Sequence, residues 1–132
     1  MARRVPWRRC RSRSTARAVV SSAGRRTTSY PAALKAAIDW HCTQWTAKPV
    51  AFVSYGGAAG GRHAVLHLEN VLTELHAVTI RDGLAFPNYF TGWQDGQPLD
   101  AGVAGYAKTL LDQLAWWAGA LRAAREAVPY PA

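Results

Sequence analysis

The most regular hydrophobic pattern lies in the middle of the chain, where a short apolar run is followed by glycines and then by a helical repeat. Residues 50–53 form an unbroken β-prone run, which predicts a central strand buried on both faces of a parallel sheet. Beyond the glycines, apolar residues at three- and four-residue spacing predict a helix from about Arg62 to Leu75. Residues 77–80, extended by residues 84–86, predict a second strand, so the order is that of a βαβ unit.

Two further helices flank this unit in the sequence. Pro31 suits the first turn of a helix that we expect over residues 32–45. Its predicted inward face consists of Ala33, Ala36, Ala37, Trp40 and Gln44, widened by Leu34, Ile38 and Trp45. A final helix is expected from about Val103 to Glu126, after an aromatic-bearing loop over residues 88–102 that is too long to be a simple connector.

The glycines after the first predicted strand mark the default binding site. Gly56, Gly57, Gly60 and Gly61 have no Cβ, so the backbone can adopt unusual dihedrals and approach a planar or anionic ligand closely. Open parallel sheets bind ligands at the carboxyl ends of their strands, which is where these glycines are predicted to lie. A P-loop is excluded, because Arg62 and His63 stand where Lys and Ser or Thr are needed.

The positive charge is concentrated at the start of the chain. The net charge of the 132 residues is +8, and nine arginines with no acid lie within residues 1–28, whereas residues 29–132 together have a net charge of −1. We expect residues 1–28 to be a basic, disordered arm, because repelling arginines and few large apolar residues cannot form a core. An alternative function follows from this arm, since a basic segment around Trp7 can bind nucleic acid without a fold.

The remaining sequence features bear on the cellular compartment and on metal binding. Cys10 and Cys42 are isolated, which favours a reducing cytoplasm over a disulfide framework or a metal pair. No apolar run is long enough to span a bilayer. The Arg-rich start resembles an organellar transit peptide in composition only. His63 and His67 are four residues apart, but surface histidines are the simpler interpretation, and we predict no metal site.

Several segments together resemble the NAD(P)H-dependent FMN reductase family. SYPAALKAAIDW at residues 29–40 is similar to the helix that follows the third strand of that family, and KPVAFVSYGGAAGG at residues 48–61 is similar to its fourth strand and flavin loop. FPNYF at residues 86–90 and LLDQLAWWAGALRAAR at residues 110–125 resemble its closing segments. The resemblance covers about residues 29–132 and implies the C-terminal half of a flavodoxin-like domain.

Two motifs of the family are not found in residues 1–28. These are the GSxRxxS loop that holds the FMN phosphate and the PEYN-type segment that flanks the isoalloxazine. The resemblance therefore implies an incomplete flavodoxin-like three-layer α/β fold that lacks the first three strands, with the strand at Val50 losing its neighbour. We hypothesise that residues 1–28 are out-of-frame translation joined to the reductase half that begins at residue 29. Reading the upstream DNA in the shifted frame tests this.

By resemblance, the cofactors are FMN and NAD(P)H, and six residues belong to the flavin site. Ser54, Tyr55, Gly56 and Gly57 would line the isoalloxazine, and Gly60 and Gly61 would let the backbone turn into the next helix. No catalytic acid or base is assigned, because the flavin performs hydride transfer and the protein positions it. We expect weak flavin binding and impaired activity of this chain alone. A homo-oligomer through the aromatic helices is a further expectation, and an inactive remnant that associates with intact reductase subunits is another alternative.

Overall fold

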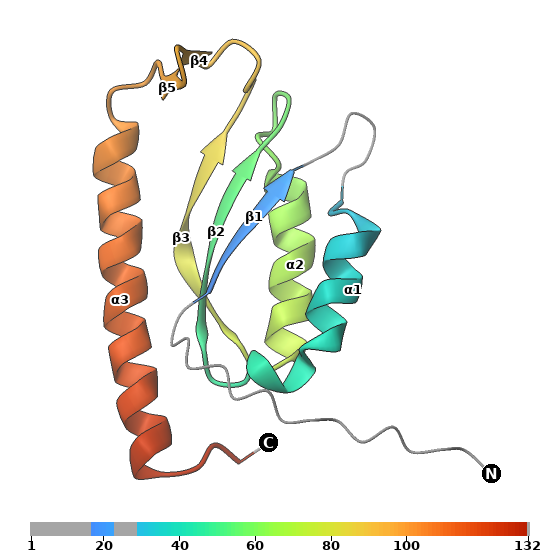
Figure 1. Cartoon of the computed structure of the whole chain (residues 1–132), viewed down its shortest axis with the longest axis vertical. Helices are drawn as coiled ribbons and strands as arrows, with labels where there is room; N and C mark the ends of the chain where they lie inside the picture. Colours follow the sequence, from blue (N-terminus) through green and yellow to red (C-terminus); the bar gives the residue numbers. More distant parts are fainter. Residues whose placement is uncertain (1–16, 23–28, 132) are drawn as a thin grey trace, which may run out of the picture.

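The computed structural model describes residues 17–22 and 29–131. Its main sheet contains three parallel strands in the order β1-β2-β3, which are β1 (Arg17–Ser22), β2 (Pro49–Tyr55) and β3 (Val78–Phe86). The helices α1 (Ala32–Trp40) and α2 (Arg62–Glu74) cover one face of the sheet, and α3 (Val103–Ala127) covers the other (Figure 1). This arrangement is a mixed α/β, partial flavodoxin-like fold.

β1 corrects part of the sequence analysis. We expected no strand in residues 1–28 and an unpaired edge at Val50, but Arg17 pairs with Val50 and the pairing continues in register to Ser22 and Tyr55. The run Ala18-Val19-Val20 is β-prone but too short to stand out among arginines and serines, and the parallel ladder with β2 supplies the hydrogen bonds that define it. The rest of the predicted disordered arm, residues 1–16 and 23–28, lies outside the described residues.

β2 is the centre of the core, as its continuous apolar run predicts. Its side chains alternate between the two faces, so Val50 and Phe52 pack towards α1 and α2 whereas Ala51 packs towards α3. The first cluster consists of Ile38, Val50, Phe52, Leu68, Leu72 and Ala77. The second consists of Ala51, Ile80, Leu110 and Leu114. Burial on both faces explains why the strand contains almost no polar residue.

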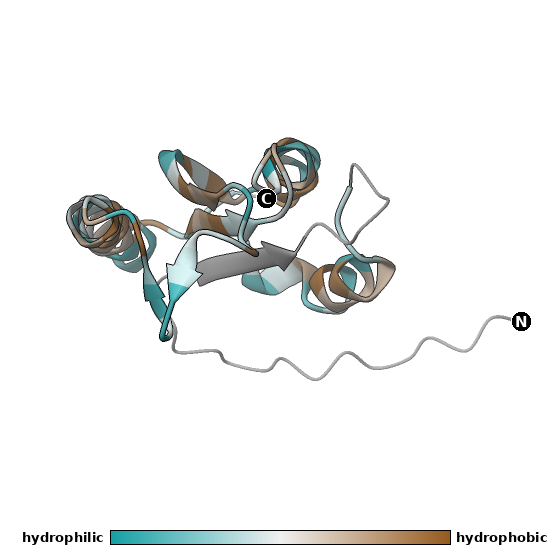
Figure 2. Cartoon of the chain, turned by 90° about the horizontal axis from the view of Figure 1, so that it is seen from above, coloured by the Kyte–Doolittle hydropathy of each residue, from teal (hydrophilic) through white to brown (hydrophobic). Residues whose placement is uncertain are grey.

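The central α2 and the C-terminal α3 agree with the predicted helices to within one residue at each end. Figure 2 shows that the helices carry both apolar and polar residues, as amphipathic packing requires. The first helix differs from its prediction. It ends at Trp40 and is followed by a 3-10 turn, η1 (Cys42–Gln44), and its buried residue is Ile38. The predicted inward face is wrong, since Trp40 is 77% exposed and Ala33, Ala36 and Ala37 are exposed as well.

The two predicted β-prone runs, residues 77–80 and 84–86, belong to the single strand β3. The register with β2 shifts between them, since Val50 pairs with Thr79 but Phe52 pairs with Gly83. The polar residues at this bulge explain why the sequence shows an interruption. One of them, Asp82, accepts a 2.6 Å hydrogen bond from the Gln113 amide on α3.

The long loop before α3 folds into a small antiparallel hairpin, β4 (Trp93–Gln94) with β5 (Gln97–Pro98), beyond the carboxyl end of β3 (Figure 1). Asp95 and Gly96 form its turn, and both have positive φ values, 50° and 77°. Within residues 17–22 and 29–131, none of the helices is both long enough and apolar enough to cross a bilayer.

Candidate functional site

The glycine loop, residues 56–61, lies at the carboxyl ends of β2 and β3 and is tied to the turn that follows β3. The Gly56 N–H donates to the Phe86 carbonyl at 3.2 Å, and the Tyr89 N–H donates back to the Gly56 carbonyl at 3.2 Å. The Asn88 N–H donates to the Gly57 carbonyl at 3.0 Å. Two loops that are about thirty residues apart in the chain therefore form one surface at this edge.

Three of the six predicted flavin contacts shape the loop itself. The buried Ser54 hydroxyl donates a 2.7 Å hydrogen bond to the Gly60 carbonyl. Gly61 has a φ of 79°, and a Cβ there would lie 3.0 Å from Ser54 Cβ and from the Tyr55 carbonyl oxygen. Gly60 has a φ of 58°, and its Cβ would lie 3.0 Å from the Pro87 nitrogen. These glycines are required by the left-handed turn and by the close approach of the backbone to β2 and β3.

Gly57 is different, because the fold does not explain its lack of a side chain. It is exposed, and a Cβ built on it would meet no atom within 4 Å. The backbone N–H groups of Gly57, Ala58 and Ala59 have no hydrogen-bond acceptor within the described part of the chain. An open glycine with neighbouring free N–H groups is suited to a ligand that presents hydrogen-bond acceptors edge-on.

Aromatic side chains border this exposed part of the loop. The half-buried Tyr55 ring meets the Tyr89 ring edge-on, with 5.3 Å between the centroids. Tyr89 also lies against Phe90, whose ring is 4.0 Å away and 64% exposed. On the β3 side, Phe86 packs on Trp93 at 5.2 Å. A planar aromatic ligand is the class of molecule that such a border favours.

The local charge favours an anionic or electron-rich ligand. α2 begins immediately after the loop, at Arg62, and its N-cap residue Gly61 contributes no side-chain hydrogen bond, so its first N–H groups carry the positive end of the helix dipole. Arg62 is exposed and forms no ion pair with any carboxylate of the described residues. It also borders a hollow of about 320 Å³ between α2 and β3, which Phe52, Leu66 and Leu84 line.

The two histidines considered for a metal lie elsewhere. His63 and His67 are both exposed on α2, and the His67 Nδ1 is 3.0 Å from the Ser29 hydroxyl oxygen. Both residues belong to the exposed surface of the helix. Cys42 is an exposed free thiol in η1, and Cys10 lies outside the described residues.

Comparison with protein families gives a decisive result. Residues 12–91 match the model of a family described as NADPH-dependent FMN reductase. The chain belongs to this family. The matched region contains β1, the glycine loop and the turn that follows β3. The family resemblance therefore begins before residue 29, which we expected to be its first residue. It ends at Thr91, and α3, which we also compared with the family, lies beyond it. No individually curated protein gives a significant match.

Family membership supports an NAD(P)H-dependent, flavin-using reductase-like function. The loop residues fit part of an FMN molecule. The free N–H groups, the open Gly57 and the Tyr55–Tyr89 pair are suited to a planar ring with acceptor atoms on its edge. The hydrogen bonds between this loop and residues 86–89 were not predicted from the sequence. Their one local signal is the Pro-Asn pair at residues 87–88, since Asn88 adopts a φ of 47°.

Proposed function

We propose that the glycine loop and the turn over residues 86–89 form the ring-binding part of an FMN site. The observation that supports this most strongly is the open Gly57, with its unpartnered N–H, beside the edge-on pair Tyr55 and Tyr89. In this proposal Tyr55, Gly56 and Gly57 face the isoalloxazine, and Ser54, Gly60 and Gly61 hold the loop in the shape that permits it. The six predicted residues thus have two different roles.

FMN, when bound, supplies the hydride and electron chemistry that a reductase needs, with NAD(P)H as the reductant. The residues of this chain bind and orient the ring. Backbone N–H groups at Gly57 and Ala58 donate to acceptors on the ring edge, and the aromatic side chains Tyr89 and Phe90 limit the access of water. No side chain of the loop is assigned a proton-transfer role.

The phosphate of FMN is the part that this chain serves poorly. The 132 residues contain no GSxRxxS motif, which is the sequence that forms the phosphate-holding nest of backbone donors in the family. The first turn of α2 and the free guanidinium of Arg62 are a partial substitute. We therefore expect weak flavin binding and a low reductase activity when the chain is on its own.

Oxidation of NADPH by the full chain in the presence of excess FMN tests the proposed ring site. The Gly57→Val variant should lower the flavin-dependent rate at least about tenfold, because a branched side chain would occupy the ring position without disturbing the fold. Gly119→Val on α3 is the matched control, since Gly119 is also exposed with no atom near its missing Cβ. Equal rates in Gly57→Val and the parent would contradict the assignment.

Two alternative functions can be distinguished from flavin-dependent reduction by experiment. Binding of nucleic acid through the arginines of residues 1–28 should be abolished by replacing those arginines with glutamine, and a protein that shows this binding but no flavin-dependent NADPH oxidation would favour that class. Association with intact reductase subunits, without activity of its own, is the other. The proposed compartment is the cytoplasm, on the basis of the two isolated cysteines.

A further inference from the structure

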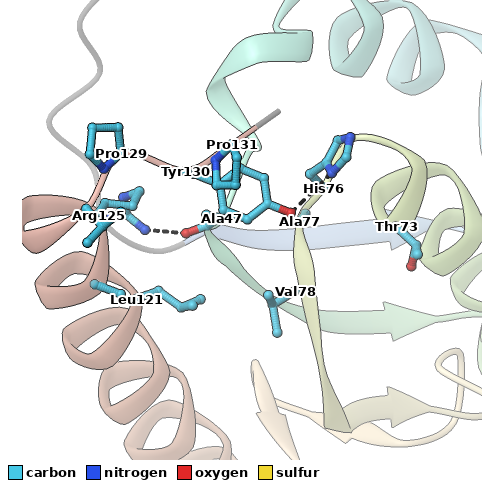
Figure 3. Close-up of a pocket in the computed structure, with 12 residues that line it drawn as sticks. Ala47, Thr73, His76, Ala77, Val78, Leu121, Arg125, Pro129, Tyr130 and Pro131 are labelled. Carbon is cyan, nitrogen blue, oxygen red and sulfur yellow. Dashed lines mark hydrogen bonds between the residues drawn. The ribbon is translucent and has the colours of Figure 1, made fainter.

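A second cavity lies at the opposite end of the sheet from the glycine loop. It has a volume of about 410 Å³, within the range of small-molecule sites, and is enclosed by the starts of β2 and β3, the end of α2 and the C-terminal part of α3 (Figure 3). Its apolar wall includes Val78, Leu121 and Val128, and its polar groups come from Arg125, His76 and Tyr130. Among the described residues, no Asp or Glu lines it.

Arg125 is the charged group of this cavity. It is half-buried, and its guanidinium donates to the Ala47 carbonyl (Figure 3). It forms no ion pair among the described residues, although α3 has a glutamate next to it. That glutamate, Glu126, pairs instead with Arg122 at 2.8 Å. The guanidinium has five N–H donors, so the bond to Ala47 leaves donors available to an anion in the cavity.

His76 lines the cavity from a backbone position that is usually occupied by glycine. The Ala77 N–H donates to the Leu72 carbonyl at 2.9 Å and the His76 N–H donates to the Thr73 carbonyl at 3.0 Å, which is the Schellman motif that ends α2. His76 is the left-handed residue of this motif, with a φ of 58°, where glycine is usual. The imidazole therefore lines the cavity from a backbone position that glycine adopts most readily.

The His76 ring is also held by the end of the chain. Its Nδ1 lies 3.2 Å from the Tyr130 hydroxyl oxygen, and the two rings meet edge-on at 5.7 Å (Figure 3). The contact bridges 54 residues and leaves Nε2 of the imidazole available. The His76 backbone is also tied to the start of β2, because the Ala47 N–H donates to the His76 carbonyl at 2.8 Å. Ala47 has a φ of 52°, so this bond joins two left-handed residues at the rim of the cavity.

From these observations we propose that the cavity binds a small amphipathic carboxylate, with its anionic head at Arg125 and its apolar body against Val78 and Leu121. A ligand with a negative head is favoured because no described lining residue is acidic and because the Arg125 guanidinium forms no ion pair among the described residues. The aliphatic walls select an apolar body of one or two rings or a short chain. The site is independent of the glycine loop, because parallel strands place their starts and their ends at opposite edges of the sheet.

Titration of the full chain with 2-naphthoate, followed by calorimetry and by backbone amide NMR shifts, tests the proposal. We expect saturable binding that shifts the amides of Ala47, His76 and Ala77 and leaves Gly57 and Tyr89 unchanged. The uncharged 2-naphthamide should bind about tenfold more weakly, the loss expected for one charge-assisted hydrogen bond. Equal affinity for the two compounds, shifts outside the cavity, or no saturation below about 1 mM would overturn the proposal.

The Arg125→Gln variant should weaken 2-naphthoate at least about tenfold and leave 2-naphthamide unchanged. Arg122→Gln is the matched control on the same helix. Its guanidinium is exposed and already engaged, since it donates a hydrogen bond to Glu126, and this bond and the charge of that carboxylate raise the pKa of Arg122. Unchanged affinity in a folded Arg125→Gln, or equal loss in both variants, would contradict the site. If Arg125→Gln does not fold, the comparison of the two compounds on the parent chain decides the matter.

Discussion

The Ser54 hydroxyl donates a 2.7 Å hydrogen bond to the Gly60 carbonyl, and this contact closes the glycine loop onto the strand from which it leaves. Ser54 is 2% exposed, so water cannot replace the bond. Ser54→Ala should lower the free energy of unfolding by about 1–2 kcal/mol, because the carbonyl of Gly60 is left without its donor in a buried place. Urea unfolding followed by circular dichroism measures this.

The control for this prediction is Thr91→Ala in the neighbouring turn. The Thr91 hydroxyl also donates to a backbone carbonyl, that of Asn88 at 3.2 Å, but the contact is exposed. Its removal should change the free energy of unfolding by less than about 0.5 kcal/mol. Equal losses in the two variants would mean that the Ser54 bond does not secure the loop.

Gly61 and Gly57 should respond in opposite ways to the same substitution. Gly61→Ala should cost at least about 2 kcal/mol of stability, because a left-handed residue gains a Cβ that lies 3.0 Å from Ser54 Cβ. Gly57→Ala should stay within about 0.5 kcal/mol of the parent, since its Cβ points into open space. Thermal or urea unfolding of the pair checks this, and similar losses in both would contradict the division of roles within the loop.

His76→Gly should stabilise the fold. Glycine relieves the left-handed strain at the end of α2, and the free energy of unfolding should rise by up to about 1 kcal/mol even though the contact with Tyr130 is lost. The matched control is Glu74→Gly, two residues earlier and within the helix, which should lose about 1 kcal/mol. A destabilised His76→Gly would show that the imidazole contact outweighs the backbone strain.

Self-association should depend on α3. Trp116 and Trp117 lie edge-on to each other at 5.1 Å on this helix, and Trp116 is 66% exposed, which is unusual for a large aromatic residue of a monomer. Sedimentation velocity should show an oligomer that Trp116→Glu disrupts. Trp40→Glu on the other face of the sheet is the control, since Trp40 is even more exposed but lies on α1. A monomeric parent, or equal effects of both variants, would exclude this interface.

The sequence predicted those parts of the fold in which one pattern dominates. The unbroken apolar run of β2 is a strong signal because the strand is buried on both faces, and the repeat of α2 is strong because one face of the helix is buried through Ala64, Leu68 and Leu72. β1 was missed because three β-prone residues between polar neighbours give no periodicity, and the ladder with β2 defines the strand. Trp40 was misplaced because the face predicted through Ala33, Ala36 and Ala37 is exposed, and the stripe that packs on the sheet runs through Leu34 and Ile38 instead.

The glycine loop was located from the sequence, with Gly60 and Gly61 expected to turn the backbone, but the contacts around each glycine were not predicted. Gly60 and Gly61 are required by backbone contacts at 3.0 Å, whereas Gly57 has none, and only coordinates distinguish these cases. The cavity at Arg125 could not be anticipated either, because it joins residues as far apart as Ala47 and Tyr130. The boundary at residue 29, the out-of-frame origin of the segment before it, and the six flavin contacts stay predictions.

The central claim is that this chain carries the ring-binding part of a flavin site but little of its phosphate-binding part. Titration of the full chain with FMN and with riboflavin, which lacks only the phosphate, tests this most directly by quenching of flavin fluorescence. We predict that both flavins bind weakly, with affinities within about threefold of each other, and that Gly57→Val weakens both. Submicromolar binding of FMN that is at least about tenfold tighter than that of riboflavin would contradict the claim.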